Sequence, residues 1–345
     1  MPSARPIQIV GGGLAGLTLG IALRRQDVPV TLFEAGHYPR HRVCGEFVSG
    51  RGLAVLEGLG LKQKFCDAGA VPAASAVLFR LEAGTPTRWF PRPALCLSRF
   101  VMDRLLAEEF QKSGGELRAG ARWEGGFGTG VVRASGRRAQ PVEDGWRCFG
   151  LKAHARNVPL AADLELHAAP DGYVGLCRLA GGEINVCGLF RRDSAGGLPP
   201  NAFDLLRGNP GTALRTRLAR AQFDPDSFCS VAGLSLAPRR AAEAPECCIG
   251  DALTMIPPFT GNGMSLAFES AQLAAGPLAA FSRGETSWDQ ARAAVARSCD
   301  GAFSRRLAWA TWLQAAMLSP RWQRLLFAFA LRSDWFWRLA FEKTR

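Results

Sequence analysis

The stretch IQIVGGGLAG, residues 7–16, places a short strand-like segment directly before a glycine-rich loop. Apolar side chains then recur at helical spacing from Leu14 to Leu23, and two arginines end this segment. The next apolar segment, residues 28–33, is strand-like and ends at Glu34. The motif G-x-G-x-x-G therefore stands in the strand–loop–helix–strand order of a Rossmann-type βαβ unit, a far stronger signal than the motif alone.

Each glycine of this loop has a physical role in holding a dinucleotide. The first permits a tight turn, the second lets the backbone approach a pyrophosphate, and the third lets the helix pack on the strand. The helix that starts here points free N–H groups and a partial positive charge at the phosphates. Glu34 has the spacing of the acid that accepts from a ribose hydroxyl, which argues against a 2′-phosphate. The residues expected to contact the dinucleotide are Gly11, Gly13, Leu14, Ala15, Gly16, Glu34 and Ala35.

Composition limits the class of protein. The chain has 345 residues, of which 48% are hydrophobic and 21% charged, and this suits a large globular fold. Its formal net charge of +12 is compatible with an anionic membrane surface or acidic ligands, although a general arginine bias explains it equally well. Helix-turn-helix, zinc-finger and RNA-recognition patterns are all missing from the sequence, so we expect no nucleic acid partner.

The cysteines do not form metal-binding or redox pairs in the sequence. None of the ten belongs to a C-x-x-C motif, and Cys177, Cys187 and Cys229 lie in apolar segments where a free thiol acts as a small hydrophobe. We therefore expect reduced thiols and no metal site. A strand and a glycine loop occupy the first residues where a signal peptide would stand, and no apolar run is long enough to span a bilayer. These features favour a cytoplasmic protein.

The periodicity changes from helical to alternating after about residue 140. Helices are expected at Gly52–Leu59 and Ser98–Ser113 and, with other helices, from about Trp288 onward. The predicted strands of an antiparallel sheet are Cys148–Ala155, Leu164–Ala169, Tyr173–Leu179 and Ile184–Phe190, with another strand at Phe228–Leu234. The expected fold class is α/β: a Rossmann-type domain, an inserted antiparallel β-sheet substrate domain and a helical C-terminus. The corresponding ranges are 1–140 with 228–285, then 141–227, then 286–345.

Two further motifs follow the glycine loop and Glu34 along the chain. Ser98-Arg99 precedes Asp103 and Leu106 in an R-x-x-x-D/L-x-x-L arrangement. Farther on, the segment GDA at residues 250–252 is followed by PPFTGNGM at residues 257–264. In this order the three motifs resemble the FAD-dependent oxidoreductases of the aromatic-hydroxylase and geranylgeranyl-reductase superfamily. The resemblance spans residues 7 to about 280, and its last motif is the most specific.

The resemblance implies FAD as the bound cofactor and NAD(P)H as a transient electron donor. Asp251 would accept hydrogen bonds from the ribityl chain, and Arg99 would contact the pyrophosphate side. The loop that starts the next helix would offer N–H donors that stabilise the anionic reduced flavin. The residues of that loop are Gly261, Asn262, Gly263 and Met264.

The segment RVCGE, residues 42–46, resembles the Cys-Gly element of the reductase-like and halogenase-like branches and would lie over the flavin ring. Arg42 is therefore also expected to contact the cofactor. No catalytic residue is assigned, but Cys44 and Glu46 are candidates. Cys44 either touches flavin or substrate or is a structural thiol. Glu46 is a candidate proton donor, although we expect a solvated loop carboxylate.

The departures from the family pattern bear on the reaction. Ser135 stands where the family's A-D-G motif has its Asp, and Gly175 stands where prenyl reductases carry a Trp after the residue matching Tyr173. The W-x-W-x-I-P element of halogenases is missing from the sequence. The leading hypothesis is thus a monooxygenase or hydroxylase that uses NAD(P)H and O2 on a hydrophobic small molecule, aromatic or polyketide-like. The alternatives are an alkene reductase of a prenyl or quinone lipid and a non-catalytic flavin-binding protein.

The C-terminal segment interleaves Trp and Phe with Arg after Trp309. An amphipathic surface of this composition can lie on a membrane, which would make the protein membrane-associated through peripheral contact. The simpler interpretation is a group of helices that pack over the substrate sheet, with arginines reaching to water. We favour the second interpretation.

Overall fold

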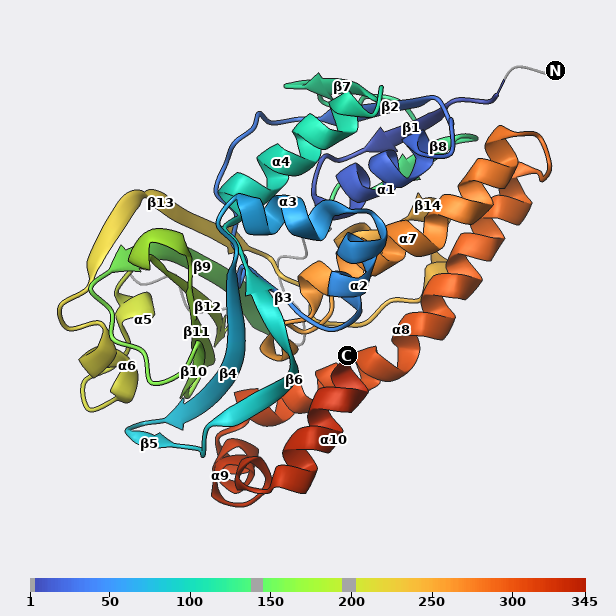
Figure 1. Cartoon of the computed structure of the whole chain (residues 1–345). Coiled ribbons are helices and arrows are strands. Elements are labelled where there is room, and N and C mark those ends of the chain that lie inside the picture. Colours follow the sequence, from blue (N-terminus) through green and yellow to red (C-terminus); the bar gives the residue numbers. More distant parts are fainter. Residues whose placement is uncertain (1–3, 138–144, 194–202) are drawn as a thin grey trace.

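The computed structural model describes residues 4–137, 145–193 and 203–345. These residues form two sheets and a group of C-terminal helices that packs against both of them (Figure 1). The chain is thus mixed α/β, with the Rossmann-like sheet and C-terminal helices that the sequence predicts.

The first sheet contains five parallel strands in the order β14-β8-β1-β2-β7. Ile9 and Leu32 are paired in register and fully buried. Leu17 and Phe268, from the helices that pack on this sheet, are also fully buried. The strands are β1 (Ile7–Val10), β2 (Val30–Glu34), β7 (Glu116–Ala119), β8 (Val131–Arg133) and β14 (Cys247–Cys248). The helices on this sheet are α1 (Leu14–Arg24), α4 (Arg99–Lys112) and α7 (Gly263–Ser282), and α1 contacts both others. The predicted βαβ unit is confirmed.

The second sheet follows the order β13-β9-β12-β11-β10-β4-β6-β3. Its strands are β3 (Phe47–Val48), β4 (Val71–Arg80), β6 (Arg88–Cys96), β9 (Trp146–Arg156), β10 (Leu164–Ala169), β11 (Gly172–Arg178), β12 (Ile184–Asp193) and β13 (Gln222–Ala232), with the short β5 (Ala83–Gly84) on β4. The four strands predicted between residues 148 and 190 are all present. The sheet is mixed, because β10 pairs with β4 in parallel while its other pairings are antiparallel.

Two long strands of this sheet, β4 and β6, are absent from the sequence prediction, as are the two-residue strands β3 and β5. β6 carries Pro91 and Pro93, and proline normally argues against a strand because it donates no ladder hydrogen bond. Both prolines lie where the register between β4 and β6 shifts, so the pairing tolerates them. The second sheet therefore takes strands from both sides of the predicted 141–227 range. The boundary at 140/141 lies outside the described residues, and the division into domains stays a prediction.

The two faces of the second sheet have different neighbours. One face, with Leu151 and Val174, packs on the short helices α5 (Phe203–Arg207) and α6 (Ala213–Arg217). The other face turns toward the first sheet and the C-terminal helices, where Leu78 belongs to one buried apolar cluster with Met317 and Phe327. This second face forms the floor of the site described below.

The remaining helices connect these layers. They are α2 (Arg51–Gly58), α3 (Leu61–Asp67), α8 (Trp288–Leu318), α9 (Pro320–Ala328) and α10 (Asp334–Thr344). The long α8 runs along α7 and then reaches the second sheet. There α9 and α10 fold back on α8 (Figure 1). None of the described helices is long and apolar enough to cross a membrane.

Candidate functional site

A cavity of about 1100 Å³ is bounded by both sheets. Its walls include the glycine loop after β1, the 40–47 segment after β2, the 257–264 loop and the inward face of the second sheet. A site for one small ligand usually measures about 300–1,000 Å³. The cavity therefore has room for an extended ligand with a second, smaller ligand beside it.

The glycine loop forms one end of the cavity. Gly13 is the N-cap of α1 and provides no side-chain cap, so the first N–H groups of the helix are open to a ligand. A Cβ on Gly13 would meet no protein atom within 4 Å. Gly11 has φ +114°, and a Cβ there would collide with the carbonyl group of Ala134. Gly16 lets the start of α1 pack closely on the glycine loop, because a Cβ at this position would collide with the carbonyl oxygen of Gly11.

Glu34 ends β2 beside this loop and is buried. Its carboxylate accepts the N–H of Gly12 at 2.9 Å and that of Gly36 at 2.8 Å, and Arg40 pairs with it at 2.6 Å. Burial alone would raise the pKa of the Glu34 carboxyl. The Gly36 N–H, Arg40 and Arg42 outweigh burial and hold the pKa below its usual range, so the group stays ionised.

Two arginines at the cavity wall share one buried carboxylate. Arg99 binds Asp103 with both Nε (2.7 Å) and Nη2 (2.9 Å), and Arg42 reaches the same carboxylate with Nε at 3.1 Å. Arg99 and Asp103 are four residues apart on α4, which places them on one face of the helix. The R-x-x-x-D spacing of the sequence thus produces a fixed pair of guanidinium groups at the cavity, suited to an anionic ligand.

Asp251 and the 257–264 loop line the cavity beside the start of α1. The Asp251 carboxylate makes no hydrogen bond with the described residues and lines the cavity. Burial raises its pKa, while Arg99 and Arg137 oppose that effect. α7 begins at Gly263 with Asn262 as an N-cap that does not cap it through its side chain. Gly261 has φ +66°, and a Cβ there would collide with the ring of Phe47.

Most residues predicted to bind the cofactor line this cavity. Those residues are Gly11, Gly13, Leu14, Ala15, Glu34, Ala35, Arg42, Arg99, Asp251, Gly261, Gly263 and Met264. Gly16 and Asn262 are not among the lining residues. Gly16 is used for packing, and the amide of Asn262 donates to the carbonyl oxygen of Thr344 at the end of α10.

The other end of the cavity is apolar. The Tyr173 hydroxyl donates to Gln314 at 3.0 Å, and burial raises the pKa of this phenol well above its usual range, so it stays protonated. The ring of Phe259 lies edge-on to Tyr173 at 5.7 Å between centroids. Further lining residues of this end are Leu78, Leu166, Leu189, Leu234, Met255, Leu313, Trp337 and Phe341. This surface suits an apolar ligand, because it offers dispersion contacts with few polar groups.

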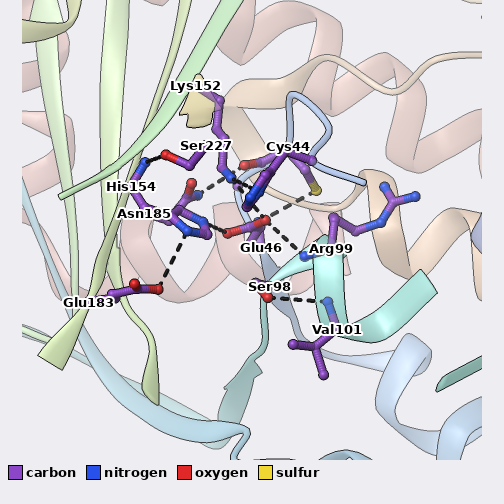
Figure 2. Close-up of polar contacts among 12 residues, drawn as sticks. Cys44, Glu46, Ser98, Arg99, Val101, Lys152, His154, Glu183, Asn185 and Ser227 are labelled. Atoms are coloured by element: carbon purple, nitrogen blue, oxygen red, sulfur yellow. Dashed lines mark hydrogen bonds and ion pairs between the residues drawn. The ribbon is translucent and has the colours of Figure 1, made fainter. Parts of the chain in front are cut away.

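The Cys44–Glu46 segment lies between α4 and the second sheet (Figure 2). Glu46 is fully buried, so the expectation of a solvated loop carboxylate is wrong. Its Oε1 accepts the backbone N–H of Arg99 at 2.8 Å, and its Oε2 lies 2.7 Å from Nε2 of His154. Burial raises the pKa of the Cys44 thiol, with Arg99 opposing it, so Cys44 is not an activated thiolate. Both side chains belong to residues that line the cavity.

The partners of Glu46 were not singled out by sequence reasoning. Lys152 and His154 alternate with apolar residues on β9, and both are buried on the face that meets Glu46. Two polar residues at alternate positions of an otherwise apolar strand were the available signal, because buried polar groups need partners.

Comparison with known proteins supports this arrangement at the level of the fold. Residues 9–47 match the model of an NAD(P)-binding Rossmann-like domain. PqsL, a probable FAD-dependent monooxygenase from Pseudomonas aeruginosa, superposes with a TM-score of 0.70 at 18% identity, covering 94% of this chain and 99% of PqsL. No curated protein matches the sequence at a significant level.

Two further solved structures have the same fold. The halogenase PltM gives a TM-score of 0.73 at 15% identity, with 99% of this chain and 83% of PltM covered. A flavoprotein/dehydrogenase from Cytophaga hutchinsonii gives a TM-score of 0.73 at 15% identity, with 98% and 90% covered. The chain therefore has the fold of FAD-dependent monooxygenase-like flavoproteins, as the order of its three motifs predicted.

Proposed function

We propose that the protein is an FAD-dependent monooxygenase that hydroxylates a hydrophobic, aromatic or polyketide-like small molecule with NAD(P)H and O2. The observation that carries this proposal is the continuity of the cavity from the uncapped end of α1 to the apolar face of the second sheet. A dinucleotide and an apolar substrate would share that cavity. In support, the similarly folded PqsL has been crystallised with 2-aminobenzoylacetate, an aromatic acid.

The residues present fit FAD. The open N–H groups of α1 and the space over Gly13 suit its pyrophosphate, and Glu34 suits a ribose hydroxyl. The carboxylate of Asp251, which has no hydrogen-bond partner among the described residues, suits a ribityl hydroxyl. The uncapped start of α7 suits negative charge on the flavin pyrimidine. When bound, FAD would take electrons from NAD(P)H and supply the O2 chemistry.

The chain itself would position the substrate and exclude water. The apolar residues from β4, β10, β12, α8 and α10 would surround the substrate, and the protonated Tyr173 is held in place by Gln314. The ionised Glu34 and the paired arginines provide the charged groups at the end of the cavity that would hold the cofactor. Few catalytic side chains are needed, because the cofactor carries the difficult chemistry.

The test is to purify the protein and measure bound FAD by absorbance and mass spectrometry, then NAD(P)H oxidation with a panel of aromatic acids and phenols beginning with 2-aminobenzoylacetate. We expect oxidation that depends on both O2 and substrate, and a product that gains one oxygen atom from 18O2. Anaerobic reduction of a prenyl alkene by dithionite-reduced protein would replace this proposal with an alkene reductase. Bound FAD without substrate-stimulated turnover would indicate a non-catalytic flavoprotein.

We also propose peripheral contact of the C-terminal helices with an anionic membrane. Trp322, Phe329 and Trp335 are 61%, 72% and 71% exposed, and α9 and α10 also carry arginines. Exposed aromatic and basic side chains together suit the interface of an anionic bilayer. The variant with all three aromatics changed to Ser should sediment less with phosphatidylserine vesicles than wild type. Equal sedimentation would leave these helices as packing elements only.

A further inference from the structure

A polar corner lies on the cavity-facing side of the second sheet, made of Glu46, Lys152, His154 and Asn185. His154 on β9 is opposite Asn185 on β12, so both side chains project from one face of the sheet. All four are at least 97% buried, and Glu46 also lines the cavity. The function proposed above does not by itself account for so many buried polar groups in one place.

The 44–46 segment is fixed to this corner by several hydrogen bonds. Asn185 donates to the carbonyl oxygen of Cys44 at 2.9 Å, and the Cys177 thiol donates to that of Gly45 at 3.2 Å. Glu46 has φ +58°, a conformation that a residue with a side chain adopts only when its surroundings impose it. The fold therefore keeps the Glu46 carboxylate turned into the sheet at the cost of backbone strain.

From Glu46 a line of titratable groups leads to the surface (Figure 2). Glu46 Oε2 is 2.7 Å from Nε2 of His154, and the other ring nitrogen, Nδ1, is 3.5 Å from Oε2 of Glu183. The Glu183 side chain is 30% exposed and its other oxygen lies 3.2 Å from Arg156 at the surface. The imidazole thus bridges a buried carboxylate and a carboxylate that water can reach.

The groups facing Glu46 from other elements are also defined. Lys152 Nζ lies 3.5 Å from Glu46 Oε1 and 3.0 Å from Nδ1 of His41, which lines the cavity. From α4, the backbone N–H of Arg99 donates to Glu46. The thiols near Glu46 are those of Cys44, Cys187 and Cys229. Lys152 supplies a positive charge that offsets the negative charge of Glu46 inside the protein.

We propose that Glu46, His154 and Glu183 form a proton relay between solvent and the cavity. Protons enter at Glu183, cross the two nitrogens of His154 and reach Glu46, while Lys152 is a positioning residue for Glu46. Positioned carboxylates and imidazoles are the usual groups for such transfer.

The inference deepens the proposed function, because that reaction consumes a proton. R–H, O2, NAD(P)H and H⁺ give R–OH, NAD(P)⁺ and H2O, so each turnover must bring one proton into the cavity. Reduction of an alkene by NAD(P)H also takes up one proton. The relay is therefore useful for either reaction and can be tested apart from both.

The first test needs no turnover. The chain contains only four histidines, so the ring N–H signals of a 15N-histidine sample can be assigned by substitution. We expect the His154 ring proton to exchange with water about tenfold more slowly in Glu183→Gln than in wild type, because Gln cannot pass a proton. Equal exchange rates in the two proteins would overturn the relay.

The second test uses the FAD-loaded enzyme. His154→Gln keeps a donor toward Glu46 but cannot transfer a proton, so we expect kcat to fall by about 10–100-fold, with a larger solvent isotope effect and an unchanged KM. The matched control is His167→Gln, which removes a His–Glu contact of 2.8 Å on the opposite face of the same sheet. The control should keep the wild-type isotope effect.

The outcomes separate the two proposals. A His154→Gln protein that loses FAD and thermal stability together, or keeps the wild-type kcat and isotope effect, would overturn the relay. Slowed exchange in Glu183→Gln without any hydroxylated product would leave the relay standing and reject the monooxygenase assignment.

Discussion

At the residue scale, substitutions of Gly11 and Gly13 should affect different properties: Gly11→Ala mainly stability, and Gly13→Ala mainly cofactor binding. Gly13→Ala adds a methyl group that meets no protein atom within 4 Å, so it should lower the free energy of unfolding by less than about 1 kcal/mol. The same methyl group enters the space where a pyrophosphate must approach, so FAD affinity should fall about tenfold or more, equivalent to about 1.4 kcal/mol. Urea unfolding and a flavin fluorescence titration measure the two effects.

Gly11→Ala is the control for that pair. With φ +114° and a collision against the carbonyl of Ala134, this variant should lose about 1–3 kcal/mol of stability before any ligand is added. Wild-type flavin affinity in Gly13→Ala, or wild-type stability in Gly11→Ala, would contradict these assignments.

The same scale shows why some site residues can be predicted from sequence and others cannot. Glu34 and Asp251 belong to local motifs whose spacing places them at the end of a strand or beside a helix start, so the sequence points to both. The buried position of Glu46 depends on its contact with His154, which is 108 positions away in the chain. Long-range pairing of this kind leaves no local pattern, so the sequence alone predicts a carboxylate in solvent.

At the scale of elements, the predictable ones are those whose pattern is set by their own residues. The strand predicted at Leu164–Ala169 has the bounds of β10, because its alternating pattern is flanked by turn residues. β6 could not be recognised because its two prolines are tolerated only at the register shift against β4. A strand such as β6 therefore forms because of its pairing with a neighbouring strand, and its own sequence does not predict it.

The position of α10, the helix that covers the apolar end of the cavity, should depend on Arg88 of β6. Its guanidinium is 5% exposed, donates to the carbonyl oxygen of Leu331 at 2.8 Å and pairs with Asp334 at the start of α10. Arg88→Met removes both contacts and should cost about 1.5–3 kcal/mol, because hydrogen bonds to charged groups are the stronger kind. Amide hydrogen exchange should become faster in residues 331–344 while that of α1 stays unchanged.

Arg92→Met provides the comparison for that experiment, since Arg92 is an exposed arginine of the same strand. It should leave exchange in α10 at the wild-type rate. Equal exchange in Arg88→Met and Arg92→Met would show that α10 is held by its apolar contacts alone.

For the whole molecule, buried thiols predict a loss of stability at high pH. Burial raises the pKa of Cys247 to about 12 and that of Cys299 to about 12, against a usual value near 9. Above pH 9 the unfolded chain releases protons that the folded protein keeps, so stability falls by up to about 1.4 kcal/mol per pH unit for each thiol. The Cys247→Ala/Cys299→Ala protein should be less stable than wild type at pH 8 and should lose less between pH 9 and 11 in urea unfolding. Parallel losses would contradict this origin.

The cavity joins segments that are distant in sequence, because α1 packs on α7 and brings the glycine loop beside the 257–264 loop. A ligand that occupies only the glycine end should protect only that end, whereas FAD should protect both loops. We therefore expect ADP to slow amide exchange in residues 11–18 alone, and FAD to slow it there and in residues 261–267. FAD at about 100 times its Kd should also stabilise the apoprotein by about 2.7 kcal/mol. Protection of both loops by ADP, or of the glycine loop alone by FAD, would mean that the cavity does not hold one extended ligand.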